Sequence, residues 1–148
     1  MTTLKMPKVD RKILKDRDKI IQDICGLTSK KNVLSEREEL KPYETDGLTA
    51  YKQTPMIVVL PETTQEVSKI LSYCNKRKIK VVPRGAGTGL AGSALPLADC
   101  VLLGLGKFNK ILEIDYKNRC VVAQPGVTNL SITQAVQDQG FYYAPDPS

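Results

Sequence analysis

The segment of this sequence with the clearest chemistry is the glycine-rich run V-V-P-R-G-A-G-T-G-L-A-G, residues 81–92. Glycine permits positive φ angles and close approach of the backbone, so successive main-chain N–H groups can point into one concavity and bind a phosphate. Thr88 adds a hydroxyl donor, whereas Pro83 fixes φ at the entry and has no amide donor. The run therefore predicts an anion-binding loop made of backbone amides.

Two other interpretations of this loop are open. The letters G-T-G-L-A-G, residues 87–92, satisfy the dinucleotide fingerprint G-x-G-x-x-G, and Glu113 lies 21 residues after Gly92, close to where a Rossmann domain places its ribose-binding acid. A Rossmann loop must open into a helix, however, and Pro96 followed by the β-like run 100–105 leaves no room for one. The second interpretation is a flexible turn between strands, but such a turn would need only one or two glycines. The sequence favours a phosphate loop without a helix behind it.

Cysteine and histidine usage limits the other chemistry. Cys25, Cys74, Cys100 and Cys120 are 49, 26 and 20 residues apart, and the chain has no histidine. The usual zinc motifs therefore cannot form, and we expect buried free thiols and no metal site.

Two further groups of residues could act on a ligand. Glu44 and Asp46 look like paired carboxylates, but without an acid or base partner we expect them in a solvated turn. Tyr43, Tyr142 and Tyr143 could approach an aromatic ring, although half-buried tyrosines with a structural role are more common. No residue is predicted to be catalytic.

Length and composition predict one folded core. The chain has 148 residues, of which 41% are hydrophobic and 26% charged, as in ordinary globular proteins. The net charge of +6 is spread over several segments with little aromatic surface between them, so nucleic acid is not an expected partner. No apolar run is long enough to enter a membrane and the first ten residues contain no apolar leader core, which favours a cytoplasmic location.

The elements that must position the loop follow a βαβ pattern. The run 56–60 is expected to be a buried parallel strand, and 79–82 a second strand that leads into the loop. Between them, Thr63 and Glu66 form a capping box at the start of a helix. Its apolar stripe is expected to comprise Val67, Ile70, Leu71 and Cys74, and the basic cluster 76–80 to complement the dipole at its end.

The flanking regions are expected to add helices and an antiparallel hairpin. Residues 10–24 predict an amphipathic helix ending at Gly26, and 28–54 a connection with little regular structure. The runs 100–105, 110–116 and 119–124 predict strands, the last two as a hairpin. A helix from Thr128 or Asn129 to Gln139, closed by Gly140, completes an α+β fold.

The loop P-R-G-A-G-T-G-L-A-G resembles the pyrophosphate loop of flavin-binding domains of the vanillyl-alcohol oxidase / p-cresol methylhydroxylase type. Five other segments look like the family of glycolate oxidase FAD subunits and D-lactate dehydrogenases, and they occur in the family's order. These segments are P-Y-E-T-D-G-L-T-A-Y (42–51), P-M-I-V-V-L-P (55–61), F-N-K-I-L-E-I-D (108–115), Q-P-G-V-T-N-L (124–130) and Y-Y-A-P-D-P-S (142–148). The resemblance covers nearly the whole chain after residue 10.

The resemblance implies FAD as cofactor and assigns its contacts. Backbone donors would wrap the pyrophosphate with help from the Thr88 hydroxyl, at Arg84, Gly85, Ala86, Gly87, Thr88, Gly89 and Leu90. Pro125 and Gly126 would line the adenosine side, and Asp146 and Ser148 would begin the stretch near the ribityl chain and ring. Some members tether FAD through a histidine near the position of Thr88, so we expect noncovalent FAD here.

The resemblance also implies a division of the chain and a reaction. Residues 1–54 would be an N-terminal helix and lead-in, and 55–148 the first part of the FAD-binding domain. Family members oxidise 2-hydroxy acids by hydride transfer to the flavin, and they continue after P-D-P-S into a further flavin segment and a substrate domain. The resemblance therefore implies the N-terminal part of a truncated or split oxidoreductase, incomplete at its C-terminus, with weak or absent FAD binding on its own.

Two functions of different kinds are consistent with these observations. The first is a part of a FAD-dependent glycolate or D-lactate oxidoreductase, with the missing C-terminal half or companion oxidase subunits as partners and a location in the cytoplasm or peripheral to a membrane. The second is a noncatalytic flavin-nucleotide or phosphate-binding module that has kept the anchor. A Rossmann NAD-binding domain is the less favoured third.

Overall fold

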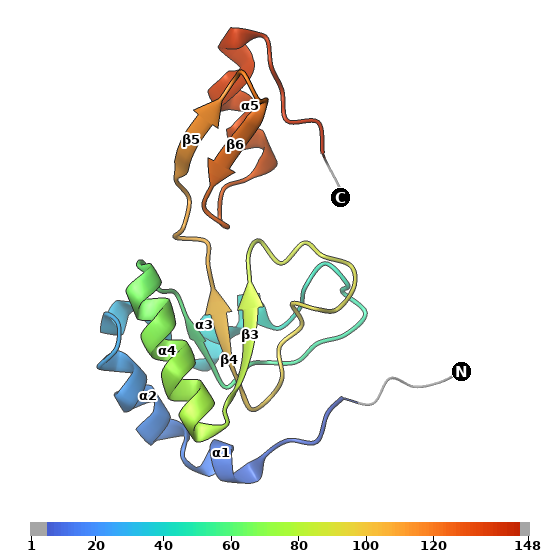
Figure 1. The fold of residues 1–148 in the computed structure, drawn as a ribbon. Coiled ribbons are helices and arrows are strands. Elements are labelled where there is room, and N and C mark those ends of the chain that lie inside the picture. Colours follow the sequence, from blue (N-terminus) through green and yellow to red (C-terminus); the bar gives the residue numbers. More distant parts are fainter. Residues whose placement is uncertain (1–5, 146–148) are drawn as a thin grey trace.

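A computed structural model describes residues 6–145 (Figure 1). The chain runs through two short parallel-sheet crossovers and ends in a hairpin followed by a helix. The elements are α1 (Arg11–Lys15), α2 (Arg17–Cys25), η1 (Lys30–Asn32), β1 (Val33–Leu34), α3 (Arg37–Leu40), η2 (Lys41–Tyr43), β2 (Ile57–Val59), α4 (Thr64–Arg77), β3 (Lys80–Arg84), β4 (Cys100–Gly104), β5 (Ile111–Asp115), β6 (Cys120–Ala123), α5 (Asn129–Val136) and η3 (Gln137–Gln139).

The first sheet has four strands in the order β1-β2-β4-β3. β2, β4 and β3 are parallel, with Val58 opposite Leu102 and Val82 opposite the same leucine, whereas β1 is antiparallel at the edge. β4 is buried along its whole length, which explains why its sequence is a continuous apolar run. The α+β fold and the βαβ unit expected from the sequence are confirmed.

One face of this sheet packs against α2 and α4. Ile20 and Ile24 of α2 and Ile70 and Cys74 of α4 form a buried cluster with the inward-facing residues of β2 and β4. The capping box is present, since the Thr63 hydroxyl accepts from the Glu66 amide at 3.2 Å while the Glu66 carboxylate accepts from the Thr63 amide at 3.0 Å. The helix ends at Arg77, as its basic last turn indicates.

Several local predictions are wrong. Leu71 is 43% exposed because the sheet contacts only the narrower stripe of α4. The single helix expected over 10–24 is two segments joined at Asp16, whose carboxylate accepts a hydrogen bond from Arg77 at 3.2 Å. Aspartate disfavours helix interiors and favours such junctions. All four cysteines are free, but Cys120 is exposed because it lies on the open hairpin.

The buried thiols and the N-terminal region belong to the first sheet. Burial raises the pKa of Cys74 and of Cys100 to about 11, so both remain protonated thiols at neutral pH. β1 and α2 share the core of β2 and β4, although they precede residue 55. The division of the chain at residues 54 and 55 remains a prediction.

The second sheet is the hairpin β5-β6, with Asp115 opposite Cys120 and a bulge between Ile111 and Glu113. Thr128 caps α5 by accepting from the Ser131 amide at 3.1 Å, and Gly140 ends the helical region with φ +76°. This unit follows β4 and stands beyond the carboxyl ends of the parallel strands (Figure 1). The expected hairpin and helix are confirmed. None of the helices in residues 6–145 is long and apolar enough to cross a lipid bilayer.

A buried carboxylate ties the N-terminal segment to the sheet. Asp99 is 2% exposed and accepts from the Lys80 ammonium at 2.7 Å and from the Asp10 amide at 2.6 Å. Burial, the largest single influence, raises the pKa of Asp99, but the hydrogen bonds from Lys80 and Asp10 and the charge of Lys80 together lower it below the usual 3.8. Asp99 therefore stabilises the fold in its charged form.

Asp99→Asn is expected to lower the free energy of unfolding at pH 7 by about 1–3 kcal/mol, because hydrogen bonds to a charged acceptor are lost. Since the folded pKa is depressed, this contribution is present above about pH 4 and is lost as the pH falls through the folded pKa. Urea unfolding at pH 7 and pH 3 measures it, with the exposed Asp138→Asn as control. An equal effect of Asp99→Asn at both pH values would contradict the assignment.

Candidate functional site

The carboxyl ends of β2, β4 and β3 meet at one edge of the first sheet because the three strands are parallel. In open α/β sheets, ligands bind outside this edge. The glycine-rich loop follows β3, and residues 105–108 follow β4. These two connections are joined by a hydrogen bond from the Leu105 amide to the Arg84 carbonyl, 2.8 Å long. Strand direction alone thus brings the predicted phosphate loop to a ligand-binding edge.

The loop contains no helix. Residues 85–99 form turns and bends without helix or strand, and Gly87 and Gly92 have φ of +76° and +73°. Glu113 lies exposed on β5 and not at a helix that follows the loop. The arrangement that a Rossmann domain requires is therefore not present in residues 85–115.

The amides of this loop are available to a ligand. Within residues 6–145, none of the main-chain N–H groups of residues 85–90 donates a hydrogen bond to a protein acceptor. Because the loop is exposed, these six donors face water, and an anion could accept hydrogen bonds from several of them at once. The loop thus fits the diphosphate of a dinucleotide. Leu90, at its far end, is 70% exposed.

Arg84 shapes the loop from its first position. Its guanidinium donates to the Tyr43 carbonyl at 3.1 Å and lies 5.7 Å from the centre of the Tyr43 ring. A Cβ added to Gly87 would meet the same guanidinium, which ends a flexible side chain and could move, so the requirement for glycine comes from the positive φ of +76°. Tyr43 therefore has a structural contact, and it acts on the loop through Arg84.

The segment 44–48 lies directly against the loop. A Cβ on Gly47 would lie 2.8 Å from the Thr88 carbonyl carbon and closer still to its oxygen. The Thr88 carbonyl therefore points toward Gly47, and because a trans peptide holds C=O and N–H in opposite directions, the Gly89 amide points away from Gly47. Gly47 thus fixes the orientation of one donor of the loop, which sequence reasoning missed.

The expected solvated turn at Glu44 and Asp46 is wrong for Asp46. Its side chain is 5% exposed, and its Oδ1 accepts from the Leu48 amide at 3.0 Å. Its Oδ2 is buried and has no hydrogen-bond partner among the described residues. The reason is Gly47, which allows the turn to pack against the loop and so removes Asp46 from water. Glu44 remains partly exposed and lies 3.5 Å from Lys52.

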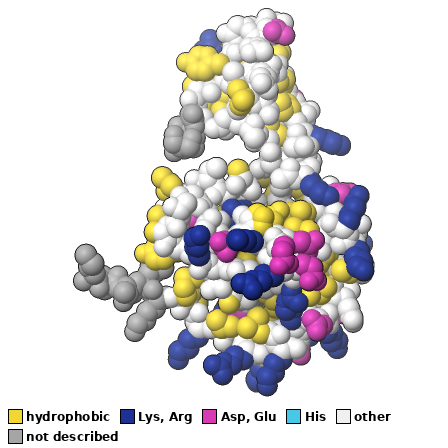
Figure 2. Space-filling view, turned by 180° about the vertical axis from the view of Figure 1, so that it is seen from behind, with side chains coloured by type: hydrophobic (Ala, Val, Ile, Leu, Met, Phe, Trp, Pro, Cys, Tyr) yellow, Lys and Arg dark blue, Asp and Glu magenta, His cyan; other side chains and the backbone are white. Residues whose placement is uncertain are grey.

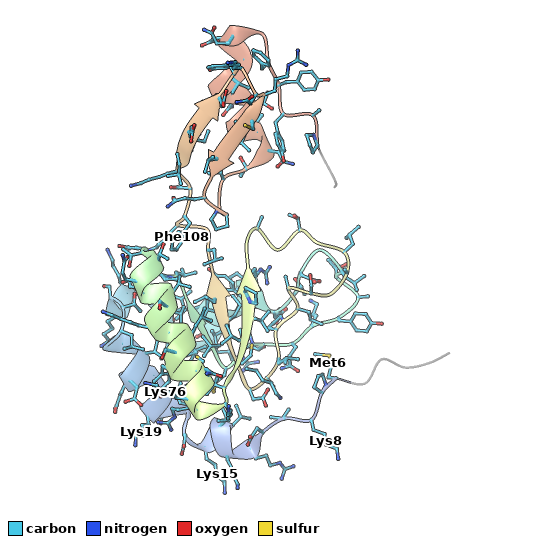
Figure 3. All side chains as sticks on the ribbon, in the orientation of Figure 1. Met6, Lys8, Lys15, Lys19, Lys76 and Phe108 are labelled. Atoms are coloured by element: carbon cyan, nitrogen blue, oxygen red, sulfur yellow. The ribbon has the colours of Figure 1, made fainter. Side chains whose placement is uncertain are left out.

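Pro125 and Gly126 adjoin the start of the loop, as the sequence predicts for residues of one site. A Cβ on Gly85 would lie 3.7 Å from the Pro125 carbonyl oxygen. The Gly126 amide donates to the Phe108 carbonyl at 2.7 Å, and Phe108 lies where the chain leaves the first sheet for the hairpin (Figure 3). The Gly85 and Pro125 segments therefore lie side by side. Asp146 and Ser148 lie outside the described residues.

Two hollows flank this arrangement. One, of about 250 Å³, lies beside the end of the loop and is lined by Leu48, Tyr51, Ala91, Gly92, Leu95 and Leu97, among others. The other, of about 680 Å³, lies against the hairpin and α5, and Tyr142 and Tyr143 line it. Both are mainly apolar, as is usual for surfaces that take the rings of a ligand.

The positive charge of the chain is not concentrated on the loop. Lys15, Lys19 and Lys76 lie at the end of the first sheet remote from the hairpin (Figure 3). Figure 2 shows Lys and Arg side chains interspersed with Asp and Glu over the same unit, and few charges over the hairpin unit. The anion-binding loop predicted from the sequence would therefore depend on its backbone amides and not on a basic cluster.

Comparison with known proteins agrees with this geometry. A model of the family described as "FAD binding domain" matches residues 55–148. The chain is 46% identical over 133 residues to glycolate oxidase subunit GlcD of Escherichia coli (strain K12), covering 90% of this chain and 27% of that protein. It is 38% identical over 118 residues to D-lactate dehydrogenase of Anaerostipes hadrus, covering 79% and 25% respectively.

A solved structure of p-cresol methylhydroxylase with substrate bound superposes with a TM-score of 0.75 at 28% identity, covering 91% of this chain and 27% of that one. The fold resemblance stated from the sequence is therefore confirmed. The chain spans about a quarter of the length of the curated relatives that it matches.

Proposed function

Because the chain belongs to the family of FAD-binding domains, we propose that its glycine-rich loop holds the FAD diphosphate within a flavoprotein that oxidises 2-hydroxy acids. The observation that carries this proposal is the set of unpaired amides of residues 85–90 at the carboxyl edge of the parallel strands. Six such amides can donate hydrogen bonds to the oxygens of a diphosphate and stabilise its charge without a helix dipole. Bound FAD would supply the hydride acceptor for the oxidation.

Each residue of the site has a proposed part. The backbone at Arg84, Gly85, Ala86, Gly87, Thr88, Gly89 and Leu90 wraps the diphosphate, and the Thr88 hydroxyl adds a donor. Pro125 and Gly126 line the adenosine side, which their contact with Gly85 supports. Asp146 and Ser148 are proposed to lie near the ribityl chain. No residue of this chain is proposed to be catalytic.

The activity of the whole protein is part of the same proposal. Relatives named as a glycolate oxidase subunit and a D-lactate dehydrogenase support a 2-hydroxy acid as substrate. The word subunit in the first name supports companion subunits as partners. Four free cysteines support a reducing compartment, and we propose the cytoplasm.

The flavin is expected to be held without a covalent bond. The chain has no histidine, and the loop carries Thr88 at its centre, so the imidazole that could tether the flavin ring is not available from this chain. Precipitation of the FAD-loaded protein with acid should release all yellow colour into the supernatant. A pellet that remains yellow after washing with denaturant would contradict the prediction.

The proposal is tested by comparing ligands that share parts of FAD. Titrations of the chain with FAD, ADP and riboflavin, followed by flavin fluorescence and calorimetry, should show FAD and ADP binding with dissociation constants above about 1 µM, since the chain spans about a quarter of the length of its relatives. Riboflavin, which lacks the diphosphate, should bind at least about tenfold more weakly than FAD. Equal affinity for riboflavin and FAD would refute the proposal.

A further inference from the structure

The buried side chain of Asp46, next in the chain to the Gly47 that contacts the glycine loop, has one unpaired oxygen. It is 5% exposed, Oδ1 accepts from the Leu48 amide, and Oδ2 has no hydrogen-bond partner within residues 6–145. Burying an unpaired polar atom is costly, and native structures hold few of them. Each such atom in a native structure requires an explanation, and a functional role is one of them.

The residue that follows Asp46 contacts the glycine loop, whose amides lack acceptors among the described residues. Gly47, next in the chain, is in contact with the Thr88–Gly89 peptide. The amides of residues 85–90 are donors without acceptors, while Oδ2 is an acceptor without a donor. A segment with an unpaired acceptor and a loop with unpaired donors are thus in contact through Gly47.

The direction of the Thr88–Gly89 peptide limits which donor can serve. The Thr88 carbonyl points toward Gly47, so the Gly89 amide points to the outer side of the loop. A carboxylate on that outer side would repel a diphosphate, whereas one on the inner side can hold the loop from behind. Thr88 has two further donors, its amide and its hydroxyl, so one of them can serve Oδ2 while the other remains for the diphosphate.

We propose that Asp46 is a positioning residue whose Oδ2 accepts a hydrogen bond from Thr88 when the loop closes on a diphosphate. The inference rests on the proposed function, because FAD supplies the diphosphate. The cost of the unpaired oxygen in the free protein is then recovered on binding, so Asp46 couples the order of the loop to the cofactor. A purely structural aspartate would stabilise the free protein instead.

The test is Asp46→Asn, which keeps the Oδ1 acceptor for the Leu48 amide and replaces the unpaired oxygen by an NH₂ group. FAD affinity should fall about 10- to 100-fold, because a hydrogen bond to a charged acceptor is lost in the complex. The melting temperature of the FAD-free variant should be unchanged or higher, because no partner of Oδ2 is lost in the free protein. The substitution should therefore weaken FAD binding without destabilising the FAD-free protein.

The matched control is Glu44→Gln, which removes one charge from the same segment but from a side chain that pairs with Lys52. It should change FAD affinity less than about twofold, since exposed pairs contribute little. Thr88→Val identifies the donor. If the hydroxyl serves, adding Thr88→Val to Asp46→Asn causes no further loss; if the amide serves, the two losses add.

Three results separate the possibilities. Failure of the unaltered chain to prefer FAD over riboflavin would refute the proposed function itself. Normal preference for FAD together with unchanged or tighter binding by Asp46→Asn would overturn the role of Asp46 alone. A lower melting temperature of the free variant with unchanged affinity would also overturn it, because the oxygen would then already be paired in the free protein.

Discussion

Gly126→Ala is expected to lower the free energy of unfolding by about 2–4 kcal/mol, the range for substitutions that overfill a packed contact. The added Cβ would lie 2.7 Å from the Leu105 carbonyl oxygen and 2.8 Å from that of Phe108. Both obstacles are backbone atoms, so a side-chain rotation cannot relieve them. The segment that joins the hairpin to the first sheet must move instead.

This movement should also weaken the binding of FAD. The Pro125 carbonyl lies beside Gly85, so displacement of residues 124–126 changes the start of the phosphate loop. Thermal unfolding should give a melting temperature roughly 5–15 °C lower, and the FAD titration a weaker affinity. Gly106→Ala is the matched control, because a Cβ there meets nothing within 4 Å. Equal melting temperatures for the two variants would contradict the packing described for Gly126.

Gly47→Ala is expected to reduce FAD affinity at least about tenfold while costing about 1–3 kcal/mol of stability. The added Cβ would lie 2.8 Å from the Thr88 carbonyl carbon and 3.0 Å from the Gly89 oxygen, so the Thr88–Gly89 peptide must shift or turn. Turning it redirects the Gly89 amide, one of the proposed diphosphate donors. The affinity should therefore change more than the stability.

Circular dichroism and thermal unfolding show whether the Gly47 variant is folded, and titrations with FAD and ADP measure how well the loop binds a diphosphate. Both ligands should lose affinity by the same factor, because both carry the diphosphate. Gly106→Ala again serves as control. Loss of FAD affinity with normal ADP affinity would place the effect at the flavin ring and contradict the described orientation of the loop.

The regular elements near the loop could be predicted because their local signals are strong. The run 56–60 is apolar and bounded by prolines, and Thr63 with Glu66 satisfies the first donors of α4. Pro96 excluded a helix after the loop, and the structure has none there. The strand order was not predictable, because the insertion of β4 between β2 and β3 depends on contacts distant in the sequence.

The part of the site contributed by residues 43–48 could not be predicted for the same reason. Asp46 and Gly47 look like an ordinary polar turn in the sequence. The burial of Asp46 and the contact of Gly47 with Thr88 arise from packing between segments about 40 residues apart in the chain. The glycine at position 47 was the available signal, because glycine allows another backbone to approach closely. Glycine in a turn has many simpler causes, however.

The most direct test of the account follows the loop amides themselves. In ¹H–¹⁵N spectra of the chain, addition of FAD or ADP should shift the amide resonances of residues 85–90, and riboflavin at the same concentration should leave them in place. Such shifts report the N–H groups proposed to bind the diphosphate, even when binding is weak. If FAD shifts only residues that line the hollow beside the hairpin and leaves 85–90 unchanged, the loop does not hold the diphosphate and the account is wrong.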